Sequence, residues 1–566
     1  MTCKKLFEKY LVPIIILIII VCACILFFFP QGSGYTILTD PPEDMRSTSD
    51  TITQDTRNQL NTVAADLKNL ADGLTGLTPD DPLAREQLYL LYEQYPNAAA
   101  VAWVDNKTDT TLTAPAFSLT EILSSPEISQ ICESSFSSDP LLLVGPVNSE
   151  SLGMMPCFVV PVRGTDGSYT GFVLMPYAAA LFQQNIAVPK TSRENLWTDV
   201  WVINSKGTLI YHPDTGTIGQ NLYQGYFVTK HPELKDGLFY IIEHPAGSIN
   251  YRAYDLAGTQ VVEKTGVWQT ISFGGQDLRV VTEQYPIPPQ MYPYVEHAGP
   301  ADQEEFVHKM YHYAKRVGME KAVAEFNDPN GAFAGTGYDL FAYTMDGTEL
   351  VSAKQVLLGA NRLNYRDAYG IRPVNSMILR AEQGGGYVHY YRIVPYTENQ
   401  AIHTSSYLRA VTEDWFVGAS RVASAVPQTY TISQREAVTK TVRIIHGWVT
   451  DYGKETALSM IMDPAQNSVI GPARILAVTY NGTLLADTQY QDKIGEDIFY
   501  LTDRHGVSTI REGVMMAKQG GGYLYLEKSN PDGNTISLVY VEPMDGSWCV
   551  LSMIRLETYN VTADLL

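Results

Sequence analysis

The first thirty residues carry an unbroken apolar run from Leu11 to Phe29, and lysines at positions 4, 5 and 9 precede it. About 20 consecutive apolar residues can span the hydrocarbon core of a bilayer as a helix, and lysines before such a helix favour an inner N-terminus. The pattern therefore predicts a cytoplasmic tail over residues 1–10 and one transmembrane helix over residues 11–29. The bulk of the chain would then lie on the extracellular or extracytoplasmic side of a cell membrane.

Two other interpretations of this run stay open. A cleaved signal peptide has a shorter apolar core, which ends in a small-residue cleavage site. The stretch from Val21 to Cys24 resembles a lipoprotein cleavage box, which would place a lipid on Cys24. The apolar run continues from Ile25 to Phe29, where a mature lipoprotein turns polar, and this favours the uncleaved anchor. All three interpretations leave the bulk of the chain outside.

After a linker over residues 30–46, the pattern predicts a long amphipathic helix. Its apolar positions alternate spacings of three and four residues, at Leu60, Val63, Leu67, Leu70 and Leu74. Such a seam can pair two copies as a homodimer through residues 47–74, or it can lie against its own domain. Gly73 and Gly76 end the pattern after a run that is short for a coiled coil. Packing within the chain is therefore favoured.

Beyond this helix, alternating apolar residues and turn residues predict antiparallel hairpins. The expected pairs are 101–105 with 110–114, 157–162 with 171–175, and 200–203 with 208–211. The second pair is joined by a turn at Thr165 to Gly167, and the third by a turn at Asn204 to Gly207.

The second half of the chain repeats itself. Residues 342–350 match residues 477–485, and the turn glycines Gly347 and Gly482 are 135 positions apart. Residues 383–388 match residues 519–524 at an offset of 136. Matches at nearly one offset indicate a duplicated module. We expect modules over residues 301–425 and 433–560, which open with helices over 304–325 and 433–460.

Composition narrows the function classes. A hydrophobic content of 45% supports folded cores, and a formal net charge of −21 argues against nucleic-acid partners, which need a basic face. After residue 30 the cysteines are only Cys132, Cys157 and Cys549, an odd number and too few for a disulfide framework. A bridge between Cys132 and Cys157 and small buried side chains both stay open.

Several of these segments resemble Cache domains, the extracytoplasmic PAS-like sensor modules of chemoreceptors and histidine kinases. The resemblance is carried by residues 201–222, 327–329, 341–348, 358–363 and 385–391. It divides the chain into a double Cache-like domain over 47–290, with sheets at about 95–180 and 197–285, and two single-Cache domains over 301–425 and 433–560.

The resemblance implies an α+β fold of tandem PAS-like Cache domains, each with an antiparallel sheet, flanking helices and a ligand cleft on one face. Cache receptors usually continue through a second membrane helix into a cytoplasmic output domain. This sequence ends at Leu566 without one. A separate membrane receptor, kinase or transporter is therefore the expected partner.

Candidate ligand contacts lie on the expected strands. Tyr387, His389 and Tyr391 alternate onto one face of the strand after the glycines, and the next strand carries Tyr407. Arg362 could form a bidentate pair with a ligand carboxylate. The equivalent strand of the last repeat carries Tyr523 and Tyr525, followed by Glu527, and Trp103 is a candidate in the first module. The alternative is that these side chains fill a core or coat a surface.

Catalytic signatures are absent from the sequence. There is no nucleophile elbow, phosphate loop, haem site or dinucleotide fingerprint, and His308 and His312 lack the glutamate of a metalloprotease motif. We expect no enzyme activity, no cofactor and no metal. The sequence favours a membrane-anchored extracytoplasmic sensor of a small polar metabolite, such as a carboxylate, amino acid or amine. A surface scaffold or adhesion protein is the leading alternative, and an anchored hydrolase is the third.

Overall fold

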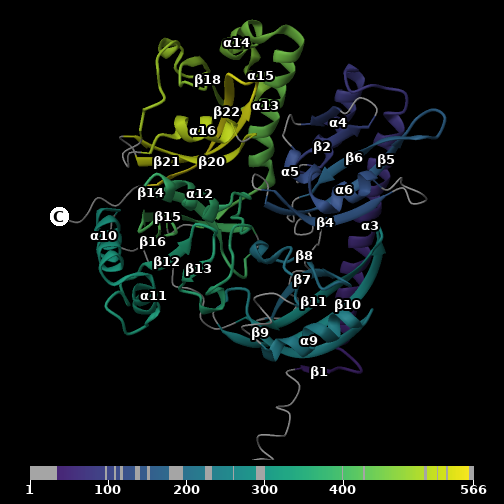
Figure 1. Ribbon diagram of the computed structural model, residues 1–566, viewed down its shortest axis with the longest axis vertical. Helices are drawn as coiled ribbons and strands as arrows, with labels where there is room; N and C mark the ends of the chain where they lie inside the picture. Colours follow the sequence, from purple (N-terminus) through teal and green to yellow (C-terminus); the bar gives the residue numbers. More distant parts are fainter. Residues whose placement is uncertain are drawn as a thin grey trace, which may run out of the picture.

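The computed structural model describes residues 35–559, apart from 96–97, 107–109, 115–118, 134–140, 150–152, 178–195, 224–231, 259, 288–299, 398, 425–426, 503–506, 519 and 531–532 (Figure 1). The expected tail and transmembrane helix at residues 1–29 lie outside the described residues. Within them, no helix combines the length and the apolar character that a bilayer crossing needs.

The described strands form four antiparallel sheets, which we number I to IV in chain order. Sheet I contains β2 (Val101–Asp105), β3 (Thr110–Ala114), β4 (Leu142–Ser149), β5 (Gly153–Arg163) and β6 (Tyr169–Pro176). Sheet II contains β1 (Tyr35–Ile37), β7 (Leu196–Asn204), β8 (Leu209–Tyr211), β9 (Gly247–Tyr254), β10 (Val261–Phe273) and β11 (Gln276–Pro286). Sheet III contains β12 (Asp339–Thr344), β13 (Glu349–Val351), β14 (Gly385–Ile393), β15 (Gln400–Ala410), β16 (Trp415–Val422) and β17 (Gln428–Thr429). Sheet IV contains β18 (Arg474–Thr479), β19 (Leu484–Asp487), β20 (Gly522–Asn530), β21 (Gly533–Pro543) and β22 (Trp548–Tyr559).

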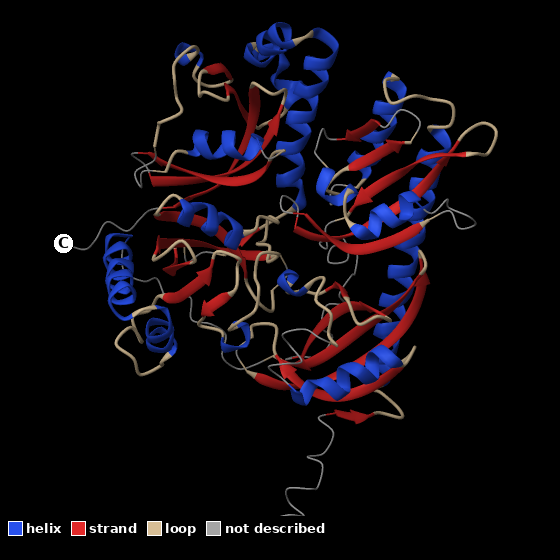
Figure 2. Ribbon diagram, viewed as in Figure 1, coloured by secondary structure: helices blue, strands red, loops and turns tan. Residues whose placement is uncertain are grey.

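All four sheets share one strand order. When the five main strands of each sheet are numbered along the chain, they lie side by side as 2-1-5-4-3. The three predicted hairpins are confirmed as β2 with β3, β5 with β6, and β7 with β8. The expected linker contributes a strand as well, because β1 pairs with β9. The α+β class with several antiparallel sheets is therefore confirmed (Figure 2).

Helices cover these sheets. They are α3 (Glu43–Gly73), α4 (Pro82–Gln94), α5 (Thr120–Leu123), α6 (Pro126–Glu133), α9 (Pro232–Glu243), α10 (Pro300–Val317), α11 (Met319–Asn327), α12 (Pro373–Glu382), α13 (Ile432–Tyr452), α14 (Lys454–Met462), α15 (Asn467–Ile470) and α16 (Thr509–Lys518). Helix α3 packs on β10 and β11 of sheet II and on β5 and β6 of sheet I. Helix α10 covers β15 and β16, and α13 covers β21 and β22.

The apolar seam of α3 is used inside the molecule. Its five seam residues are 0–6% exposed and belong to one core cluster with side chains of sheets I and II. The packing within the chain that the sequence favours is therefore the one observed. The seam is already covered, so a homodimer would need a different surface.

The prediction of one continuous opening helix in each repeat is wrong, because the structure has two consecutive helices there. Helix α10 ends before Gly318 and α13 ends before Gly453, and these glycines have φ angles of +84° and +80°. L-residues rarely adopt such positive φ values, so the helix stops there and α11 or α14 restarts in a new direction. The apolar pattern continues across both glycines, and periodicity alone therefore did not reveal the break.

One hairpin turn recurs in sheets II, III and IV. Gly207, Gly347 and Gly482 follow β7, β12 and β18, respectively, with φ angles of +80°, +83° and +89°. A Cβ atom on each of them would lie within 2.5 Å of the side chain of Tyr223, Leu363 or Phe499, respectively. Glycine is required there both for the left-handed backbone and for the side chain that crosses the turn.

Buried charges join sheet III to sheet II. Nη1 of Arg362 donates to Oδ2 of Asp214 at 2.7 Å, and the arginine side chain is only 6% exposed. Burial alone would raise the pKa of Asp214, but the guanidinium outweighs it and holds that pKa below its ordinary value. Glu349 on β13 is also buried, and burial raises its pKa to about 7 although the charge of Arg362 opposes the shift. This charge cluster fixes how the two halves of the chain meet.

Substituting Gly347 with alanine should destabilise the protein more than the same change at Gly167. Both glycines have φ near +80° in hairpin turns, but only the Cβ at position 347 would collide with a neighbour. We expect a loss of about 1–2 kcal/mol from the backbone alone in Gly167→Ala, and a further ~1–3 kcal/mol in Gly347→Ala. Thermal and urea unfolding measure both. Equal losses would contradict the packing described for Leu363.

The substitution Glu349→Gln should stabilise the protein only at neutral and alkaline pH. The folded-state pKa of about 7 lies above the ordinary value of 4.5, so the unfolded chain releases this proton first as the pH rises. Stability is therefore lost between about pH 4.5 and pH 7, and glutamine, which cannot ionise, avoids the loss. We expect a gain of roughly 1–3 kcal/mol at pH 8 and almost none at pH 4.5. The exposed Glu413→Gln is the matched control, and a gain that does not change with pH would contradict the buried carboxylate.

Candidate ligand-binding site

An open cavity of about 1000 Å³ lies where the four sheets come together. Sheet I contributes residues of β4 and β5, and sheet II contributes the loop 216–220. Sheets III and IV contribute most of the wall, through residues 361–383, β14, α16 and β20. In Figure 1 sheets III and IV lie on the left and sheets I and II on the right, so a molecule in this cavity would touch both halves of the chain.

Asp367 shapes the segment that forms one wall. Its Oδ1 accepts hydrogen bonds from the backbone N–H groups of Tyr369 and Ile371, at 3.0 and 2.9 Å. Its Oδ2 accepts from the backbone of Tyr391 at 3.1 Å and from the hydroxyl of Tyr525 at 2.6 Å. The resulting turn leads to Pro373, whose fixed φ suits the first position of α12. Burial raises the pKa of Asp367 to about 6.

Three arginines gather at the start of this wall. Nη2 of Arg366 and Cδ of Arg372 lie 3.1 and 3.3 Å from the point where a Cβ on Gly153 would sit. Arg366 donates to the carbonyl of Gly370 at 3.0 Å, and a Cβ on Gly370 would lie 2.7 Å from Nη1 of Arg435. All three arginines line the cavity. Burial, and then the nearby charges of Arg372 and Arg435, lower the pKa of Arg366 to about 9.

The sequence analysis missed this cluster. It considered Arg362 alone, although Arg366 and Arg372 follow within ten residues. Three arginines within eleven residues, close to Gly370 and Pro373, could have predicted an anion-binding segment from the sequence. Arg435 had no such signal, because it comes from α13 and reaches the cavity only through the packing of sheet IV on sheet III.

Four of the predicted ligand contacts line the cavity together. Tyr387 and His389 project from β14, and Tyr523 and Tyr525 project from β20. The sequence analysis treated the two strands as walls of separate pockets. In the structure the strands approach each other, because the rings of Tyr391 and Tyr525 are 5.5 Å apart and Nε2 of His389 lies 3.5 Å from Oε2 of Glu527. The two repeats therefore share one wall.

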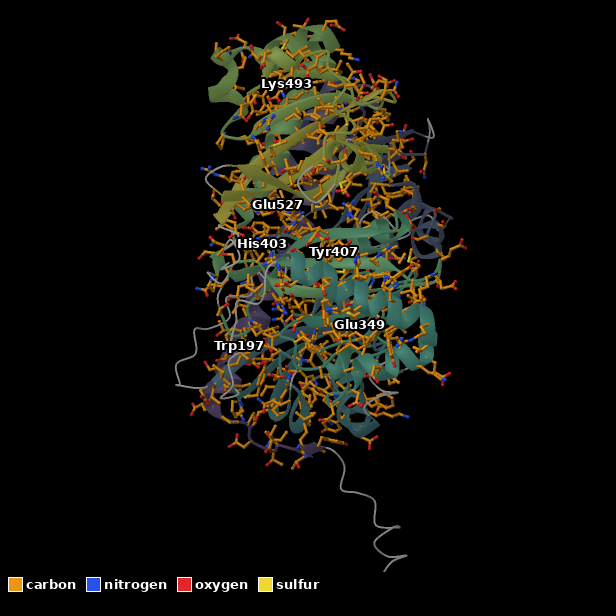
Figure 3. The ribbon with its side chains drawn as sticks, turned by 90° about the vertical axis from the view of Figure 1, so that its left-hand side faces the viewer. Trp197, Glu349, His403, Tyr407, Lys493 and Glu527 are labelled. Atoms are coloured by element: carbon orange, nitrogen blue, oxygen red, sulfur yellow. The ribbon has the colours of Figure 1, made fainter. Side chains whose placement is uncertain are left out.

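A chain of buried polar groups runs behind this wall. Nδ1 of His389 lies 3.1 Å from Nε2 of His403, whose Nδ1 lies 2.7 Å from Oε1 of Glu557. The Tyr391 hydroxyl donates to the same glutamate oxygen at 2.9 Å. Figure 3 shows His403 and Glu527 close to the boundary between sheets III and IV. Tyr391 is fully buried here and does not line the cavity.

The remaining predicted contacts lie elsewhere. Arg362 is engaged by Asp214 at the joint between sheets II and III. Tyr407 packs against α10, where its hydroxyl lies 3.4 Å from Nε2 of His308. Trp103 is 2% exposed within the core cluster that includes α3 and α4. None of these three side chains lines the cavity.

Comparison with solved structures returns sensor domains. An extracellular ligand binding receptor from Desulfohalobium retbaense is 17% identical, with a TM-score of 0.32, and the match covers 43% of this chain and 40% of that chain. The periplasmic sensory domain of the Campylobacter jejuni chemoreceptor Tlp1 is 11% identical, with a TM-score of 0.32, over 43% of this chain and 93% of that chain. The ligand binding domain of the Pseudomonas aeruginosa amino acid chemoreceptor PctC, in complex with GABA, is 14% identical, with a TM-score of 0.31, over 42% and 95%.

Comparison by sequence gives a family. No curated protein matches this chain. The family model of the Cache domain matches residues 321–550, which start within α11, end within β22 and cover most of both repeats. The predicted resemblance is therefore confirmed for residues 321–550, which match the Cache domain.

Proposed function

We propose that this protein is an extracytoplasmic sensor that binds a small polar metabolite in the cavity between its sheets. One observation carries the proposal: an open cavity of about 1000 Å³ is lined by strands of sheets I, III and IV and by a loop of sheet II, and it combines arginine, tyrosine and histidine side chains. Small-molecule sites are concave, mostly pre-formed and equipped with a few convergent polar groups. The Cache match of residues 321–550 adds support from the family, whose domains are extracytoplasmic sensors.

The position of the cavity provides a mechanism. A ligand held between residues of sheet I or II and residues of sheet III or IV favours the arrangement in which both sets touch it. Binding would therefore shift the population towards one relative placement of the two halves. In this proposal a surface formed by both halves carries the signal to a separate membrane receptor, kinase or transporter. The membrane anchor and this partner stay predictions from the sequence.

The proposal predicts that a ligand stabilises the full chain and that filling the cavity removes the effect. Carboxylates, amino acids and amines would be screened by thermal shift, since a ligand at 100 times its Kd adds ~2.7 kcal/mol. Asn375 lines the cavity from α12, so Asn375→Trp should abolish the shift by occupying the space. Asn330 lies in an exposed turn after α11, so Asn330→Trp is the matched control and should keep it.

Two outcomes would contradict the proposal. A broad screen without any stabilising compound would remove the sensor function. A compound whose stabilisation persists in Asn375→Trp would bind elsewhere, and the central cavity would then not be the sensory site.

A further inference from the structure

The arginines at the start of α12 indicate which chemistry the cavity recognises. We propose that this end of the cavity binds a small molecule with two or more anionic oxygen groups, either carboxylates or phosphates. The inference rests on the proposed function and narrows its ligand from polar metabolites in general to polyanions.

The geometry brings three guanidinium groups to one place from different directions. Arg366 and Arg372 both approach Gly153 of β5, and Arg366 and Arg435 both approach Gly370. Guanidinium groups present planar sets of donors that match carboxylate and phosphate oxygens. Like charges repel at this range, and an anion placed between them would turn that repulsion into attraction.

Part of this donor capacity is unused. The buried Nε of Arg435 has no hydrogen-bond partner among the described residues, while its guanidinium stacks 4.4 Å from the centre of the Tyr523 ring. A buried donor left unsatisfied costs free energy, which an acceptor on a ligand would recover.

The backbone adds to the positive potential. Helix α12 begins next to Arg372, and no side chain caps its first turn. Asn375 and Ser376 of that first turn line the cavity. The first N–H groups of a helix carry a partial positive charge and bind anions readily.

The carboxylates that line the cavity are engaged or lie at its other end. Glu512 pairs with Arg380 near the C-terminal end of α12, where Glu382 also lies. Glu527 lies beside His389 and accepts from Asn534 at 3.0 Å, and Glu121 accepts from Ser149 at 2.6 Å. The nearby Asp367 already accepts four hydrogen bonds. Among the described residues that line the cavity, arginines therefore outnumber carboxylates at this end.

Calorimetric titration of the full chain tests this inference with five probes. Citrate and succinate represent carboxylates, pyrophosphate represents phosphates, and serine and putrescine are the zwitterionic and cationic comparators. We expect at least one anion to bind, and Arg372→Gln to weaken that binding about tenfold or more. Arg372→Lys should recover part of the loss. Arg316→Gln, an exposed arginine on α10 away from the cavity, should bind as the parent does.

The outcomes separate the inference from the function on which it rests. If serine or putrescine binds, Asn375→Trp abolishes that binding and the anions do not bind, the polyanion inference is overturned and the sensor function stands. Anion binding that Arg372→Gln or Asn375→Trp leaves unchanged overturns the inference too, because the anion is then held elsewhere. If none of the five probes binds at millimolar concentration, the inference is overturned. The thermal-shift screen of polar metabolites then decides whether the sensor function stands. The relative affinities of citrate and pyrophosphate identify which acidic group of a ligand the site prefers.

Discussion

A charge that leaves water needs a partner, and in this protein the partners come from different sheets. Arg362, which follows β13 of sheet III, pairs with Asp214, which follows β8 of sheet II, and the buried Glu557 of sheet IV lies 2.7 Å from the ring of His403 on sheet III. Removing one partner leaves a buried charge without compensation, and the loss of folding stability is then far larger than the net contribution of the pair. These contacts therefore fix how the sheets are placed, more than they add to overall stability. The cavity is the space that this placement leaves in the middle.

The same principle separates structural from functional arginines. Arg362 and Arg380 each contact a carboxylate and hold two parts of the chain together. Arg366, Arg372 and Arg435 lie beside one another on a cavity wall, and burial together with the charges of the other two lowers the pKa of Arg366. Strongly perturbed groups in a cleft are typical of functional sites.

Local structure was largely predictable from the sequence, and the candidate site was only partly so. Turn glycines and strand alternation predicted the hairpins, and the seam of α3 predicted its buried face, because these features depend on neighbouring residues. Alternation also placed Tyr387, His389 and Tyr391 on one face, but it could not say what covers that face. The covering element is β20, more than a hundred residues away. Likewise Arg362 was recognised as a carboxylate partner, while the carboxylate belongs to Asp214, 148 residues earlier in the chain.

The duplication explains why the shared wall is asymmetric. At the repeat offset of 136, Tyr387, His389 and Tyr391 correspond to Tyr523, Tyr525 and Glu527. Strands β14 and β20 approach each other. If β20 had kept the residues of β14, the shared wall would contain only histidine and tyrosine at these positions and no carboxylate. The change to glutamate at position 527 supplies an acceptor next to His389, and Tyr525 donates to Asp367 of the other repeat. Divergence of the two copies thus made their facing surfaces complementary, and neither repeat could form this wall alone.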